Sequence, residues 1–141
     1  MVRNVGRLKH LVFSAHGYIS YDQLQGGCYN SRIDIGAGLD KYNIKLFRDL
    51  RDSVNGGVIW FGSCGIGNDN ERNFERASLS GAYVVAPVQY MAPKPGSSRV
   101  IPYGKIDMFE RYQPKVFAPT GELVAWASFV RMGKQLGLRP S

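Results

Sequence analysis

Two residues with side chains capable of covalent chemistry follow short apolar segments of the chain. The apolar segment 11–15 runs into His16-Gly17, and the apolar segment 58–61 runs into Gly62-Ser63-Cys64. In open α/β sheets, reacting groups gather in the crevice at the carboxyl ends of the strands. If the two segments form parallel neighbouring strands, His16 and Cys64 emerge at the same edge of the sheet. A thiol beside an imidazole is the smallest set of groups that supports nucleophilic catalysis.

The elements that would position these residues alternate between strands and helices. Apolar runs predict three strands, at residues 9–15, 58–61 and 82–86. Asp40 is expected to cap a helix that reaches about residue 54, because apolar residues follow it at near-helical spacing. Asn68 and Glu71 resemble a capping box, which predicts a second helix ending at Gly81. This order implies right-handed crossovers and an α/β fold with a mostly parallel central sheet.

The rest of the chain is expected to form loops and shorter elements. Residues 17–38 are rich in Tyr, Gly, Asn and Ser, and they predict a long loop with one short extended piece at 32–35. A loop of that length in a compact domain is usually functional or mobile. Further along, the sequence predicts a loop at 92–104, short strands at 106–109 and 115–117, and a closing helix at 122–136.

Length and composition indicate one globular domain over residues 1–141. Apolar residues make up 44% of the chain and charged residues 21%, which is typical of a folded domain with its own core. No apolar stretch approaches the roughly 20 residues that span a bilayer. The segment 11–15 is also too short for a secretory signal. We therefore expect a soluble, cytoplasmic protein with no membrane partner.

The net charge of +7 comes from scattered basic residues rather than from a block of like charges. Such a field favours anionic partners, but no nucleic-acid-binding motif accompanies it, so we expect a solvated surface and no nucleic-acid partner. The two cysteines, Cys28 and Cys64, form no C-x-x-C motif or Cys/His cluster. We therefore expect no metal site and no cofactor. Sequence alone does not exclude a disulfide between them, although both are expected to be reduced.

At the two strand ends, the chain resembles the caspase-like cysteine peptidases, the superfamily of caspases, gingipains, separases and the self-cleaving domains of large bacterial toxins. Their shared pattern is a strand ending in His-Gly, then a helix, then a strand ending in the nucleophilic Cys. Here His16 and Cys64 are 48 residues apart (64 − 16), close to the spacing of about 50 in caspases. The resemblance covers about residues 8–90, leaving a loop-rich part at 92–141, and Gly62-Ser63-Cys64 is most similar to the toxin domains.

The resemblance implies a three-layer α/β sandwich and an endopeptidase that acts through a thioester acyl-enzyme. Cys64 would be the nucleophile and His16 the general base and acid. The backbone N–H groups of Gly17 and Cys64 would form the oxyanion hole. The substrate would be a protein or peptide, either a partner or the chain itself.

Other side chains are expected near this site. Tyr18, Ser63, Gly65 and Asp22 are candidates to line it, and Asp22 or Asp34 could orient His16. Ser63 lacks the Gly-x-Ser-x-Gly context of a serine hydrolase and should point away from Cys64. Elsewhere, His10 is interpreted as an exposed edge residue, and Trp60 and Trp126 as core residues.

The chain also departs from the family pattern, and other functions stay open. Further strands usually precede the His-bearing strand, but only about ten residues do so here. An exposed sheet edge would favour a homodimer. Residues 92–141 are short for the part that builds the caspase substrate cleft. One alternative is a catalytically silent caspase-like interaction module, indifferent to Cys64→Ala. Another is an anion- or nucleic-acid-binding α/β domain, whose binding would fall steeply with salt.

Overall fold

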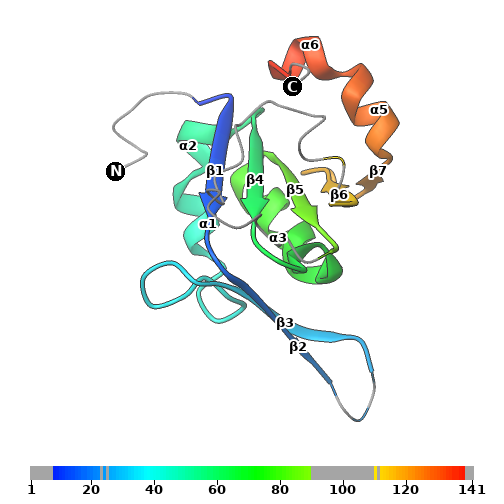
Figure 1. Cartoon of the computed structure of the whole chain (residues 1–141). Coiled ribbons are helices and arrows are strands. Elements are labelled where there is room, and N and C mark those ends of the chain that lie inside the picture. The colour runs from blue at the N-terminus through cyan, green and yellow to red at the C-terminus, as the bar shows by residue number, and fades with distance from the viewer. Residues whose placement is uncertain (1–7, 23, 25, 90–109, 111, 139–141) are drawn as a thin grey trace, which may run out of the picture.

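The computed structural model describes residues 8–22, 24, 26–89, 110 and 112–138. Five strands form one sheet in the order β1-β4-β5-β6-β7 (Figure 1). Their bounds are β1 His10–Ser14, β4 Val58–Gly62, β5 Tyr83–Pro87, β6 Pro114–Phe117 and β7 Leu123–Val124. The α/β class expected from the sequence is confirmed.

The three strands predicted around the candidate site are present and parallel. β1 pairs with β4, and β4 pairs with β5, so the expected neighbours are neighbours. All five residues of β4 are buried, as a central strand covered on both faces requires. The prediction of a mostly parallel sheet was wrong for the other half, because β5–β6 and β6–β7 are antiparallel. A tight turn at 118–122 joins β6 to β7, and such a turn can connect only antiparallel neighbours.

Helices cover both faces of the sheet, and β4 divides its side chains between them. Ile59 and Phe61 pack in a cluster with helices α1 (Leu46–Asp49), α2 (Arg51–Val54) and α3 (Asn70–Ser80). Val58 and Trp60 pack in a second cluster with α5 (Trp126–Arg131) and α6 (Gly133–Leu136). This alternation is the period of two expected along a strand.

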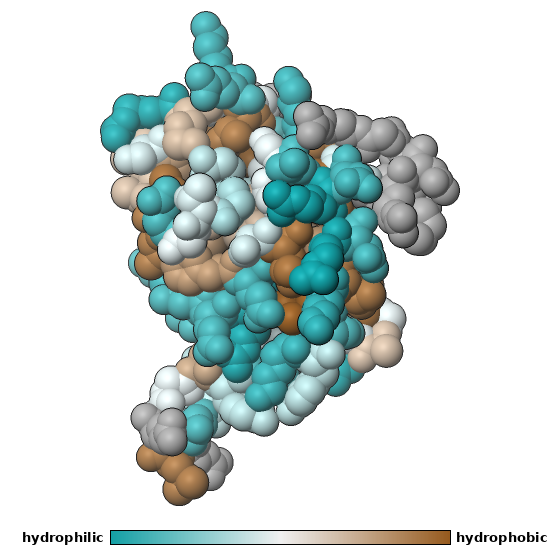
Figure 2. All heavy atoms as spheres, turned by 180° about the vertical axis from the view of Figure 1, so that it is seen from behind, coloured by the Kyte–Doolittle hydropathy of each residue, from teal (hydrophilic) through white to brown (hydrophobic). Residues whose placement is uncertain are grey.

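A β-hairpin replaces the long loop predicted at 17–38. Strands β2 (Gly17–Tyr21) and β3 (Cys28–Ile33) pair antiparallel and extend away from the main sheet (Figure 1). Gly26 and Gly27 at the turn have φ angles of 75° and 77°, which side-chain-bearing residues rarely adopt. Seen from behind, polar side chains cover much of the body, and apolar atoms are exposed at the hairpin end (Figure 2).

The helices differ from the predictions mainly at their starts. Asp40 does not cap a helix, because its carboxylate accepts from the Tyr42 N–H in a turn, and α1 begins only at Leu46. The cap of α3 is Asp69 rather than the predicted Asn68, and Gly81 ends this helix in the left-handed conformation as expected. The predicted closing helix at 122–136 begins at Trp126, because residues 123–124 pair with β6 instead.

His10 is not the exposed edge residue that was predicted. Its Nδ1 accepts from Trp60 Nε1 at 3.0 Å, and its Nε2 lies 3.2 Å from Gly137 O. Trp60 is buried in the core as expected, and Trp126 is half-buried against Phe129. The predicted strand at 115–117 is β6. The predicted loop at 92–104 and strand at 106–109 lie outside the described residues. No helix in the described part of the chain could cross a membrane.

Candidate functional site

The two residues singled out for chemistry emerge at the same edge of the sheet. β1 and β4 are parallel neighbours, and Ser14 pairs with Gly62 in their register. His16 and Cys64 therefore each lie two residues beyond a paired position, on strands that are typically about 4.8 Å apart. His16 is exposed, whereas Cys64 is only 7% exposed.

The backbone of Gly17 lies directly against the backbone of Cys64. A Cβ atom at position 17 would be 2.7 Å from Cys64 O and 3.0 Å from Cys64 N, and 2.9 Å from the Ile66 side chain. No residue with a side chain fits at those distances. The glycine after His16 is therefore needed to bring the two strand ends together.

The pairing of the hairpin also sets the direction of the Gly17 N–H. Gly17 stands opposite Ile33, and the flanking Asp34 N donates to His16 O at 2.8 Å. In an antiparallel ladder, flanking bonds of this kind identify a non-hydrogen-bonded pair. The Gly17 N–H therefore points away from β3. The hairpin ladder therefore does not use this donor.

A cavity of about 210 Å³ opens beside Cys64, between the hairpin and the end of β5. It is lined by Gly17, Tyr18, Ile19, Tyr21, Cys64, Gly65, Asn68 and Val88. The predicted site residues Tyr18 and Gly65 thus lie beside Gly17 and Cys64. Ile19, Tyr21, Asn68 and Val88 were not predicted. Val88 could have been found, because it directly follows a strand at the same carboxyl edge of the sheet.

The other predicted lining residues lie elsewhere. Ser63 is fully buried, and its Oγ has no hydrogen-bond partner among the described residues. Asp22 is at the hairpin turn, where its carboxylate accepts from the Leu24 N–H at 2.9 Å. Asp34 interacts with His16 through its backbone: its N–H donates to the His16 carbonyl oxygen.

Hydrogen bonds fix the turn after Cys64 to the segment after β5. Gly65 adopts a φ of 69° and leads into the short helix η2 (Ile66–Asn68). The Asn68 side chain donates to Gly65 O at 3.1 Å and to Val88 O at 3.0 Å. Gly65 N donates to Gln89 O at 3.3 Å. The turn that carries Cys64 and the segment after β5 are therefore held together by the Asn68 side chain and by one backbone hydrogen bond.

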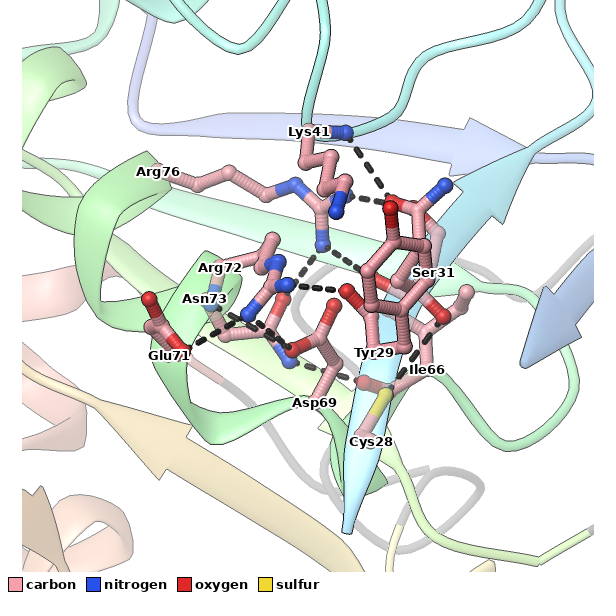
Figure 3. Close-up of polar contacts among 11 residues, drawn as sticks. Cys28, Tyr29, Ser31, Lys41, Ile66, Asp69, Glu71, Arg72, Asn73 and Arg76 are labelled. Atoms are coloured by element: carbon pink, nitrogen blue, oxygen red, sulfur yellow. Dashed lines mark hydrogen bonds and ion pairs between the residues drawn. The ribbon is translucent and has the colours of Figure 1, made fainter. Parts of the chain in front are cut away.

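A buried polar cluster ties the hairpin to α3 (Figure 3). Arg72 donates to the carbonyl oxygen of Tyr29 and to Glu71 Oε2, and it lies 3.7 Å from Asp69 Oδ1. Arg76 is fully buried, and burial lowers the pKa of its guanidinium to about 10. Burial, and then the charge of Asp69, raise the pKa of the Cys28 thiol to about 11. Sequence reasoning missed this cluster, because its charged residues are spaced as on a solvated helix face.

Both cysteines are free thiols, so no disulfide joins them. Within the described ranges, no group of three or more His, Cys, Asp or Glu side chains could hold a metal ion. Comparison of the chain with protein-family models, curated proteins and solved structures finds no significant match.

Proposed function

We propose that this chain is a cysteine endopeptidase of the caspase-like type, with Cys64 as nucleophile and His16 as general base and acid. The observation that carries the proposal is the contact of Gly17 with Cys64. The two backbones are so close that a Cβ atom added to Gly17, the residue after His16, would come within 3 Å of the Cys64 carbonyl oxygen. The three parallel strands and the helices on both faces support a three-layer arrangement of the caspase-like kind.

The proposed reaction has two balanced steps. Cys64 Sγ attacks the scissile carbonyl carbon while His16 accepts the thiol proton. His16 passes that proton to the leaving nitrogen as the C–N bond breaks, which leaves a thioester on Cys64. Water then attacks the thioester with His16 as base, the C–S bond breaks, and His16 returns the proton to Sγ. The N–H groups of Gly17 and Cys64 would stabilise the oxyanion, by about 3 kcal/mol each.

The substrate would be a protein or peptide that lies along the hairpin. Tyr18 and Tyr21 are 54% and 60% exposed, and both line the cavity beside Cys64. Exposed aromatic side chains at the rim of a cavity are suited to hold an extended chain. The scissile carbonyl would then lie in the cavity beside Cys64.

A panel of peptidyl acyloxymethyl ketones with different terminal residues tests this proposal. At least one member of the panel should form a covalent adduct on Cys64, which peptide mass mapping locates. The adduct should be absent in Cys64→Ala and strongly reduced in His16→Ala, whereas Cys28→Ser should not affect it. A panel that leaves Cys64 unmodified, in protein shown to be folded, would contradict the proposal.

The burial of Cys64 favours a second candidate, a silent module that binds a partner through the hairpin. Cys64 packs in the same cluster as Val58 and Trp60, where a thiol can act as a small apolar side chain. In that case, Cys64→Ala would leave the function of the protein unchanged.

A further inference from the structure

A continuous line of buried hydrogen bonds connects the two halves of the candidate site through α3 (Figure 3). Asn73 Nδ2 donates to Ile66 O at 2.8 Å, and Asn73 Oδ1 accepts from Arg76 Nη1 at 2.9 Å. Arg76 then donates to Ser31, with Nη1 to Oγ at 3.0 Å and Nη2 to the carbonyl oxygen at 3.1 Å. Asn73, Arg76 and Ser31 are each 0% exposed. We call this line, Ile66–Asn73–Arg76–Ser31, the polar relay.

One end of the polar relay lies in the turn that carries Cys64. Ile66 is two residues beyond Cys64, and its side chain is one of the three closest neighbours of the position that a Gly17 Cβ would occupy. The Asn73 side chain donates to the carbonyl oxygen of Ile66. A shift of Ile66 would therefore change both the Cys64 turn and its contact with Gly17.

The other end lies in the hairpin. Ser31 pairs with Ile19 of β2, and Ile19 lines the cavity beside Cys64. The residue after β3 also holds His16, because Asp34 N donates to His16 O. The position of Ser31 therefore fixes the strand that carries the His16-Gly17 half of the site.

Burying the guanidinium of Arg76 costs folding free energy, which indicates that its geometry is needed at this position. A guanidinium removed from water loses its hydration, and apolar residues of similar volume often fill such sites at no loss of stability. No hydrogen bond or ion pair links Arg76 to a carboxylate within the described part of the chain. Its hydrogen-bond partners are Ser31 and Asn73, and its guanidinium lies over the rings of Phe47 and Phe61, 5.8 and 5.5 Å from their centroids. Only the planar fork of arginine can hold both partners in a fixed arrangement.

We propose that Asn73 and Arg76 are positioning residues that set the spacing between the Cys64 turn and β2, the strand that begins at Gly17 directly after His16. This inference rests on the proposed function, since the pair that the polar relay aligns is the Cys64–His16 pair. It predicts that a change in the middle of the relay disturbs both ends together, although they are far apart in sequence.

Arg76→Lys is the central variant, because it keeps the charge but loses the fork that reaches two partners. Asn73→Leu breaks the other link at similar volume. Arg51→Lys is the matched control: Arg51 donates to Ser78 O at 3.1 Å and so ties the opposite end of α3 to α2, away from Cys64. Phe117→Leu, in the same core cluster as Ala77 of α3, controls for general loss of stability.

Hydrogen–deuterium exchange of the full chain is the first measurement. Arg76→Lys and Asn73→Leu should each speed exchange in both 28–33 and 64–68, relative to 58–62. Arg51→Lys should leave exchange in both segments unchanged. Phe117→Leu should speed exchange in these two segments no more than in 58–62. Faster exchange in only one of the two segments would overturn the inference, whether or not the protein is a peptidase.

The alkylation rate of Cys64 by iodoacetamide, measured in a Cys28→Ser background, separates this inference from the proposed function. Arg76→Lys should lower the His16-dependent rate about tenfold or more. Phe117→Leu, compared at a similar melting temperature, should keep the parent rate. If the parent rate depends on His16 but not on Arg76, the inference fails and the proposed function stands. If the parent rate ignores His16, the proposed function fails, and the exchange result alone decides the inference.

Discussion

Gly17→Ala is the substitution whose effect follows most directly from the structure. The added methyl group would lie 2.7 Å from Cys64 O, about 0.7 Å closer than an ordinary contact of 3.4 Å. Two of the three nearest atoms, Cys64 O and Cys64 N, belong to the backbone, so the Cys64 turn or β2 must move. Overpacking of this kind costs about 1–3 kcal/mol of folding free energy. A displacement approaching 1 Å in a catalytic arrangement can lower its rate about 100-fold. We therefore expect a modest loss of stability and a large loss of Cys64 reactivity.

Gly56→Ala is the matched control for this prediction. Gly56 has a φ of 81°, so alanine is strained there by about 1–2 kcal/mol, but no atom lies within 4 Å of the added Cβ. Thermal unfolding should show losses of similar size in the two variants. Alkylation of Cys64 by iodoacetamide should slow only in Gly17→Ala. Reactivity that is unchanged in Gly17→Ala, or lost equally in Gly56→Ala, would refute this account of the contact.

Two further predictions concern the surrounding structure. Because the pKa of Cys28 is raised to about 11, only about 0.1% of this thiol is thiolate at pH 8. It should therefore alkylate about 100-fold more slowly than free cysteine, as measured by peptide mapping. A rate near that of free cysteine would contradict this prediction. Trp60→Phe removes the donor to His10 Nδ1 at 3.0 Å and should lower the unfolding free energy by about 1–3 kcal/mol, measured in urea. An unchanged unfolding midpoint would show that this bond contributes nothing.

The sequence was sufficient to predict the strands that carry the site. Apolar runs of four or five residues identify β1, β4 and β5, because strands buried on both faces need no alternation. Glycines at 56, 57 and 81 identify the ends of the helices between them. The equal offset of His16 and Cys64 from their strands then follows from a parallel register, which the structure has.

The hairpin was missed because its strands are not apolar. Tyr18, Ser20, Asn30 and Arg32 line a surface groove. The other side of the hairpin combines two apolar residues, Ile19 and Ile33, with the buried polar residue Ser31. A strand pair of this composition is specified by its Gly-Gly turn and by its contacts with η2 and α3. Those contacts are tertiary, and periodicity along one chain does not contain them.

The polar relay was missed for a related reason. Asn73 and Arg76 occupy neighbouring positions on a helix, a pattern typical of an exposed face. Their burial depends on the hairpin, which covers this face of α3 and supplies Ser31 as a partner. The antiparallel half of the sheet was also hidden, since β6 is short and β7 has only two residues.

The rate of Cys64 alkylation at neutral pH, compared between Cys28→Ser and Cys28→Ser/His16→Ala, tests the central claim most directly. We predict a fast rate with Cys28→Ser alone that falls sharply when His16 is removed. A slow rate at neutral pH that is indifferent to His16 would contradict the peptidase assignment. It would leave Cys64 as a packing residue in the silent module.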